Sequence, residues 1–242
     1  MRPRAAKLIV CFAALFILAG TGAQAEVTRA EYADPTTEYA HGILGDAVEY
    51  ATLKIYFKRA LAKEKAAVIR APKGHVFEDT APRLWDVDGD GAPEVVTILT
   101  NIKRGAALAV FDENGLIART PFIGRTHRWL APVGVGDLDN DGRIEIAYVD
   151  RPHLAKVLRI WRLDGTRLRH VVDVEGLTNH KIGWDFIAGG VRDCGAGPEV
   201  ITANAGWTQI MATRFVSGAV QRRAIVRFNS PSDFAAVMGC RQ

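Results

Sequence analysis

Short apolar segments separated by polar turns run along the chain from about residue 75 onward. The clearest are 95–99, 107–111, 146–149, 157–163, 200–203 and 210–216. They are rich in Val, Ile and aromatic residues and are bounded by Gly, Asp, Asn and Pro, which is typical of strands rather than helices. Because no long amphipathic helix fits between them, the pattern predicts an all-β chain and argues against a parallel α/β fold.

The apolar segments belong to a repeat that is marked by acidic loops. Two loops, Asp86–Glu94 and Asp137–Glu145, are nearly identical, and a degenerate third copy lies at 191–199. Their last glutamates are spaced by 51 residues (94 to 145) and 54 residues (145 to 199). Four short strands in about fifty residues are the signature of a propeller blade. We therefore expect a β-propeller of roughly four blades, complete or partial, with four short antiparallel strands per blade.

The repeat divides the chain into units. We expect blades with acidic loops at 75–126 and 127–179, a blade with a degenerate loop at 180–235, and a tail at 236–242. Residues 26–74 are expected to form a degenerate first blade without an acidic loop.

The first blade is the least regular part of the pattern. Residues 47–57 alternate in part between apolar and polar side chains, as strands do, whereas 58–65 are charged and Ala-rich. A short helix and a hairpin loop fit this charged segment equally well. The alternative for the whole region is one long helix over 46–71.

The first 25 residues have the layout of a secretory signal peptide. A basic start is followed by the apolar segment 8–20 and by the small-residue site 23–25. The apolar segment is shorter than the roughly 20 residues of a membrane-spanning helix, so a retained anchor is the less favoured alternative. We expect a periplasmic or secreted chain that begins at Glu26, forms a single domain over 26–242 and has no membrane span.

Removal of the leader changes the charge balance. The formal net charge of +4 includes Arg2, Arg4 and Lys7 of the leader. Without these three residues, 28 Lys and Arg stand against 27 Asp and Glu, a net charge of +1. Binding of nucleic-acid phosphates requires a clustered excess of cations, so no nucleic-acid partner is expected.

Each acidic loop presents carboxylates at alternate positions. Positions 1, 3, 5 and 9 are Asp86, Asp88, Asp90 and Glu94 in the first loop and Asp137, Asp139, Asp141 and Glu145 in the second. Carboxylates so close repel one another unless a cation neutralises them, and hard oxygen ligands in this number suit Ca²⁺. Gly91 and Gly142 allow a sharp turn, and the carbonyls of Ala92 and Arg143 would supply a further ligand to each ion.

Other acidic loops fit less well. EF-hands require a glutamate at position 12 and flanking helices, whereas this chain has Thr97 or Tyr148 there and strand-like flanks. The dockerin interpretation fails for the same reason, and Mg²⁺ demands a stricter octahedral geometry. The remaining alternative is a pair of solvated acidic turns without metal.

These loops resemble the FG-GAP/VCBS repeat family, whose blades are similar to those of the integrin α-subunit propeller. The resemblance rests on Asp86–Glu94 and Gly136–Glu145 and covers about residues 75–230. It implies that the acidic residues bind Ca²⁺ on a strand-to-strand turn of each blade, and it indicates little about biochemical function. The chain departs from the family in its length, because closed rings of that family usually have more blades.

The third loop keeps Asp193 and Glu199, but Val191 and Gly195 stand where the other loops have aspartate. We therefore expect no Ca²⁺ in the third loop.

Two cysteines remain after leader cleavage. Cys194 lies in the degenerate loop and Cys240 lies near the end of the chain. In an oxidising compartment such a pair is a candidate disulfide, which would replace the missing ion and fasten the tail to the last blade. Two buried thiols are the alternative.

Histidines recur at corresponding places in the units, 11, 10 and 11 residues before position 1 of the loop, with His41 as a candidate counterpart in the first blade. The candidate pocket comprises His75, Arg125, His127, His180 and Asp185. Such a cluster would bind a ligand or a second metal. We favour the structural alternative, in which each histidine orders the entry to its blade through a backbone hydrogen bond.

The sequence contains no nucleophile elbow, zinc-protease motif or phosphate loop. We therefore expect a calcium-stabilised, non-catalytic binding or structural module of the cell envelope that presents loops to a protein or glycan partner. The alternative is a periplasmic hydrolase or lyase that uses His127, His180 and Asp185. A third hypothesis is an incomplete propeller that closes by forming a homodimer.

Overall fold

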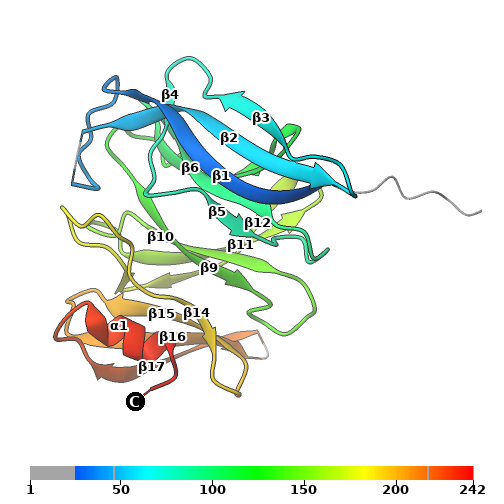
Figure 1. Cartoon of the computed structure of the whole chain (residues 1–242). Coiled ribbons are helices and arrows are strands. Elements are labelled where there is room, and N and C mark those ends of the chain that lie inside the picture. The colour runs from blue at the N-terminus through cyan, green and yellow to red at the C-terminus, as the bar shows by residue number, and fades with distance from the viewer. Residues whose placement is uncertain (1–24, 46, 217, 242) are drawn as a thin grey trace, which may run out of the picture.

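The computed structural model describes residues 25–241 except 46 and 217. The expected leader therefore lies outside the described residues, apart from Ala25. The described part of the chain is all-β with one short helix, and its strands form three antiparallel sheets. The sheets are stacked in chain order, as the colours from blue to red show in Figure 1.

The first sheet contains eight strands in the order β1-β2-β4-β6-β7-β8, with β3 paired to β2 and β5 paired to β6. Its strands are β1 (Ala25–Thr36), β2 (Glu49–Arg59), β3 (Lys65–Arg70), β4 (His75–Phe77), β5 (Arg83–Trp85), β6 (Glu94–Asn101), β7 (Gly105–Asp112) and β8 (Gly115–Arg119).

The second sheet has the four strands expected of one repeat unit, and the third has five. The second has the order β12-β11-β10-β9, with β9 (Leu130–Gly136), β10 (Glu145–Asp150), β11 (Val157–Asp164) and β12 (Arg167–Glu175). The third contains β13 (Leu177–Thr178), β14 (Gly190–Asp193), β15 (Pro198–Asn204), β16 (Gln209–Val216) and β17 (Ala219–Arg227). Helix α1 (Ser232–Met238) covers part of this last sheet.

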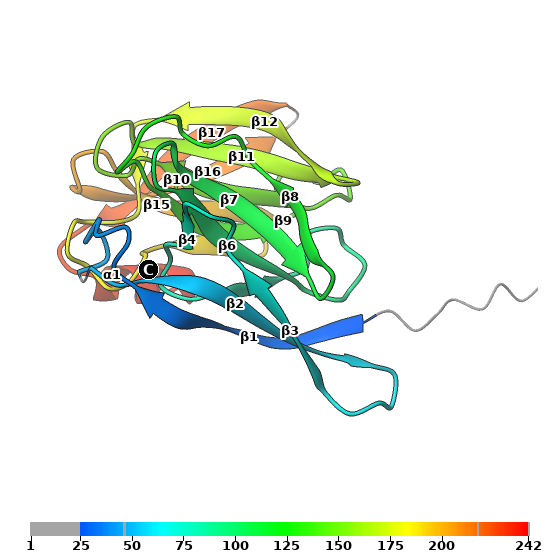
Figure 2. The same cartoon turned by 90° about the horizontal axis from the view of Figure 1, so that it is seen from above.

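The region expected to be a degenerate first blade is made of strands, so the alternative of one long helix over 46–71 is wrong. Residues 60–64 connect β2 to β3 as a hairpin that projects from the stacked sheets (Figure 2). However, β1–β3 do not form a separate sheet. They continue the sheet of the next unit, because β2 pairs with β4 at Tyr50 and Phe77.

Strand β6 explains how the sheets are held together. Its side chains alternate between two apolar clusters, because successive residues of a strand point to opposite faces. Val96 and Ile98 pack in the cluster that includes residues of β9 and β10, whereas Val95 and Leu99 pack in the cluster that includes residues of β1 and β2. A strand covered on both faces is almost wholly buried, which accounts for the continuous apolar run in the sequence.

Candidate metal loops and a histidine cavity

The acidic loops occupy the same place in successive units. The first connects β5 to β6 and the second connects β9 to β10, and in both the glutamate at position 9 is the first residue of the following strand. The side chain of Glu94 turns back and accepts a hydrogen bond from the amide of Val87, at 2.9 Å. Glu145 does the same with the amide of Leu138, at 2.8 Å. These bonds close each loop at its base.

Aspartates organise the rest of the first loop. Both oxygens of Asp86 accept backbone amides, from Gly89 at 2.7 Å and Gly91 at 3.0 Å. Asp88 accepts the amide of Asp90, at 3.1 Å. These bonds hold the carboxylates close to one another in a tight turn.

The two loops have left-handed backbone at two corresponding positions. Gly91 and Gly142 have φ values of 90° and 84°, so the expectation of a left-handed turn at these positions is confirmed. At the preceding left-handed position the first loop has Gly89 (81°) and the second has Asn140 (59°). Asparagine tolerates this region better than other side chains, so both sequences accommodate the turn.

In the first loop the carboxylates act on one another. Burial raises the pKa of Glu94 to about 7, with contributions from the negative charges of the aspartates at positions 1, 3 and 5. Burial also raises the pKa of Asp88, and Asp90 and Asp86 add to the shift. A cation placed among these groups would therefore be strongly stabilised.

In the second loop a positively charged side chain already lies among the carboxylates. Arg162 of β11 reaches back into the loop and forms ion pairs with Asp139 at 3.0 Å, with Asp141 at 2.9 Å and with Glu145. The guanidinium is mostly buried and Glu145 is fully buried. Arg162 therefore neutralises part of the negative charge that was expected to require an ion.

Strand register explains why the loops differ. Arg162 is the direct cross-strand partner of Glu145. In the first sheet Val95 pairs with Phe111, which places Asp112 opposite Glu94. The residue opposite the loop glutamate is thus an arginine in the second sheet but an aspartate in the first.

Both loops still fit a divalent ion. In each, three carboxylates bring oxygens within 4.8 Å of one another: Asp86, Asp88 and Asp90 in the first, and Asp137, Asp139 and Glu145 in the second. One buried oxygen of Asp139 has no hydrogen-bond partner, which shows that Arg162 does not satisfy the second loop completely. A hollow of about 260 Å³ lies beside the first loop, and its lining includes four carboxylates, Asp88, Glu94, Asp112 and Glu113. Its lining also includes Arg59, which forms an ion pair with Glu113 at 2.8 Å.

In the third loop, side chains compensate the charge of the buried glutamate. Glu199 is buried and is held by Arg192 at 3.0 Å and by Arg223 at 2.7 Å, and these arginines lower its pKa against the effect of burial. The expected disulfide between Cys194 and Cys240 is present and joins this loop to the residues after α1.

The histidines expected at corresponding places have different surroundings. His75 bonds the carbonyl of Lys73 at 3.1 Å and the side chain of Asn101 at 3.0 Å, so it ties β4 to β6. His180 is buried, and its Nε2 bonds the carbonyl of Trp184 at 2.9 Å. Each of these two histidines thus bonds a backbone carbonyl, as the structural alternative predicted.

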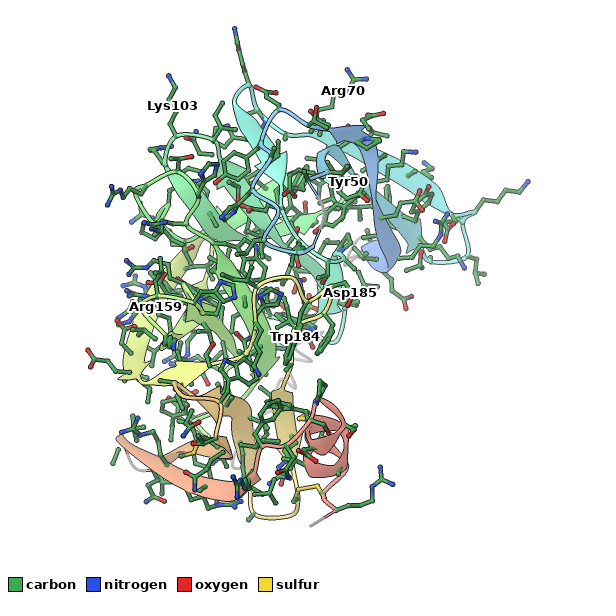
Figure 3. All side chains as sticks on the ribbon, turned by 90° about the vertical axis from the view of Figure 1, so that its left-hand side faces the viewer. Tyr50, Arg70, Lys103, Arg159, Trp184 and Asp185 are labelled. Carbon is green, nitrogen blue, oxygen red and sulfur yellow. A yellow bond between two sulfur atoms is a disulfide. The ribbon has the colours of Figure 1, made fainter. Side chains whose placement is uncertain are left out.

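His127 stands apart from the other two. Its backbone φ is 54°, its amide donates to the hydroxyl of Tyr39 at 2.7 Å, and its ring stacks on His41 with a centroid distance of 4.9 Å. Together with His41 and His153 it lines a cavity. Arg125, His75 and Asp185 of the candidate pocket do not line it; Asp185 is exposed on the segment between β13 and β14, next to Trp184 (Figure 3).

Two important groups were missed in the sequence. Arg162 is a charged residue within an apolar strand segment. Because arginine is rarely buried without a partner, this position indicated a buried carboxylate nearby. Glu78 is fully buried and accepts hydrogen bonds from His41 and, at 2.5 Å, from Thr100. Its position directly after the apolar strand β4 was the only local sign of burial.

Comparison with known proteins supports the repeat. Residues 86–148 match the FG-GAP-like repeat family, which confirms the resemblance over the first two acidic loops. No curated protein gives a significant match to the chain. Within the described residues, no helix combines the length and apolar character needed to cross a membrane.

Proposed function

We propose that the chain is an exported, calcium-stabilised module of the FG-GAP type that acts as a non-catalytic binding or structural component of the cell envelope. Its sheets β4–β8, β9–β12 and β13–β17 correspond to propeller blades, and β1–β3 extend the first of them. The arrangement is thus an incomplete form of the expected ring of about four blades. The disulfide is compatible with an oxidising compartment.

One observation carries the calcium proposal. Asp86, Asp88 and Asp90 converge at the tip of the first loop, and Glu94 behind them has its pKa raised to about 7 by burial and by their charges. Such a concentration of carboxylate oxygens is costly without a cation, and oxygen ligands in this number favour Ca²⁺. The affinity of such an extracellular site is expected to be on the order of 10⁻⁴ to 10⁻³ M.

The two loops are expected to bind calcium unequally. The first loop offers its carboxylates to an ion, whereas Arg162 competes for Asp139, Asp141 and Glu145 in the second. We therefore propose the first loop as the stronger site and the second as a weaker one.

The proposal is tested by thermal unfolding of the mature protein in EDTA and in millimolar calcium. Calcium should raise the melting temperature of the wild type, because an ion that binds only the folded state stabilises it. Asp88→Asn should abolish most of this increase and Asp139→Asn should reduce it less. Asp193→Asn, at the same position of the third loop, is the matched control and should leave the calcium response unchanged. A wild-type melting temperature that does not respond to calcium would show that the metal assignment is wrong.

The catalytic alternative has little geometric support. His127 lines the cavity and His180 lies behind His153, but Asp185 is exposed and does not line it. The three residues proposed for a hydrolase or lyase therefore do not form a common site in the described part of the chain. A homodimer that completes the propeller stays a prediction, and sizing by light scattering tests it.

A further inference from the structure

A second candidate site lies in a cavity away from the acidic loops. The cavity has a volume of about 250 Å³ and is formed by connecting segments of successive units. Its polar lining consists of three histidines (His41, His127 and His153) and two arginines (Arg128 and Arg151), and no carboxylate is found among the described lining residues.

The charge of the cavity favours an anion. Arg151 directs Nε and Nη2 to the carboxylate of Asp150, at 2.8 and 3.0 Å, so its charge is compensated. Arg128 is half-buried and donates Nη1 to the carbonyl of His127, at 3.0 Å. A carbonyl carries no net charge, and no ion pair of Arg128 occurs within the described chain. Arg128 therefore supplies the positive charge of the cavity.

The histidines supply fixed hydrogen-bonding groups. A carbonyl can only accept, so Nε2 of His180 carries the proton towards Trp184, and Nδ1 of neutral His180 accepts from Nε2 of His153 at 3.0 Å. Burial lowers the pKa of His153 to about 4, and this ring is neutral near pH 7. His41 is oriented in turn by the bond between its Nδ1 and buried Glu78. The rings of His41 and His153 are therefore held in place before any ligand enters.

The remaining walls are apolar. Trp129 and Ile43 are buried at the cavity, whereas Leu154 and Ile182 are 62% and 70% exposed. Large aliphatic side chains that are this exposed at the edge of a cavity offer contact area to a ligand with a hydrocarbon part.

We propose that this cavity binds a small organic carboxylate, with the carboxylate on Arg128 and the hydrocarbon part against Leu154 and Ile182. Arginine and carboxylate form strong, charge-assisted hydrogen bonds. A metal ion is disfavoured, because the described residues bring three ligand atoms together only in the two acidic loops.

Isothermal titration in millimolar calcium tests the proposal with benzoate as the probe. Benzyl alcohol has the same ring without the charge, and inorganic phosphate has charge without the ring. Benzoate should bind at least about tenfold more tightly than either, since a charge-assisted hydrogen bond and apolar contact both contribute.

Substitutions then locate the site. Arg128→Met should weaken benzoate binding by about tenfold or more. Leu154→Glu, which places a negative charge at an exposed position of the mouth, should do the same without affecting the fold. Arg125→Met removes a neighbouring exposed arginine that does not line the cavity and should stay within about twofold of the wild type.

Three outcomes would overturn the proposal: benzoate does not bind, phosphate or benzyl alcohol binds as tightly as benzoate, or the Leu154→Glu variant binds benzoate as tightly as the wild type. Melting curves check that each variant is folded. If Arg128→Met does not fold, the result for Leu154→Glu decides the question. Because the cavity shares no residue with the acidic loops, failure of the calcium proposal would leave this test intact.

Discussion

At the scale of single residues, the glutamate at position 9 of the loop has different surroundings in each of the three units. Glu94 lies among aspartates, Glu145 is paired with Arg162, and Glu199 is held by two arginines. A buried carboxylate must be neutralised, paired or bound to a metal. The repeat thus keeps the residue while its compensation changes from one unit to the next.

Arg162→Met is the most informative residue change. It should destabilise the protein by about 3 kcal/mol, because it leaves Glu145 buried without its partner. In calcium the loss should be partly recovered, since an ion would then take the place of the guanidinium. Urea unfolding with and without calcium measures both effects. Arg169→Met, on exposed strand β12, is the control and should change stability by less than about 1 kcal/mol.

The prediction would be contradicted if calcium stabilised the Arg162→Met variant no more than it stabilises the wild type. Such a result would mean that Arg162 and an ion do not compete for the second loop.

At the scale of elements, close approaches of backbone set where strands begin. Gly105 opens β7 with a φ of 75°, and a Cβ there would lie 2.3 Å from the carbonyl oxygen of Arg125. Both the conformation and the space require glycine.

Gly105→Ala should therefore destabilise the protein by about 2 kcal/mol or more, through left-handed strain and a backbone clash. Gly206→Ala, where a Cβ would meet only Thr208 at 4.0 Å, is the control. Chemical denaturation compares the two variants. Equal stabilities would show that the β7 turn tolerates a side chain.

The disulfide connects two elements that the chain order separates. Cys194 and Cys240 close a loop of 46 residues between the third acidic loop and the end of α1. Closing a loop of this length stabilises a fold by about 4 kcal/mol in the chain-entropy model.

Reduction with dithiothreitol should accordingly lower the melting temperature by several degrees, and Cys194→Ser with Cys240→Ser should reproduce the shift. The double variant should in turn be insensitive to the reductant. An unchanged wild-type melting temperature under reducing conditions would contradict a stabilising role of the disulfide.

At the scale of the whole molecule, buried histidines connect stability to pH. Burial lowers the pKa of His153 to about 4 and also lowers that of His180, from an ordinary value of 6.5. Between these values the unfolded chain binds protons that the folded protein does not, so stability rises with pH across this window. The two histidines therefore contribute less stability as the pH falls from 7 towards 4, whereas Glu94, whose pKa is raised to about 7, contributes in the opposite direction over the same window.

His153→Gln keeps a hydrogen-bond donor but removes one titrating group, so on acidification from pH 6.5 to 4 the variant should lose less stability than the wild type, or gain more. Glu78 and Glu94, whose pKa values are raised by burial, act in the opposite direction, but they are common to both proteins and cancel in the comparison. Urea unfolding at several pH values measures the two slopes. Identical slopes would show that His153 titrates alike in the folded and unfolded states, which would contradict a lowered pKa.

The sequence by itself determined the properties that depend on short-range rules. Alternation and turn residues predicted an all-β chain, and the spacing of carboxylates and glycines predicted loops that close around one centre. These features involve residues within one loop or one strand. Local sterics and hydrogen bonding therefore suffice to specify them.

The tertiary structure decided what lies opposite each loop. Cross-strand register places Arg162 against Glu145 but Asp112 against Glu94, and it joins β1–β3 to the sheet of the next unit. It also gathers His41, His127 and His153 from separate segments into one cavity. Such contacts depend on how strands pair and sheets stack, and no rule of local sequence specifies which distant side chains then meet.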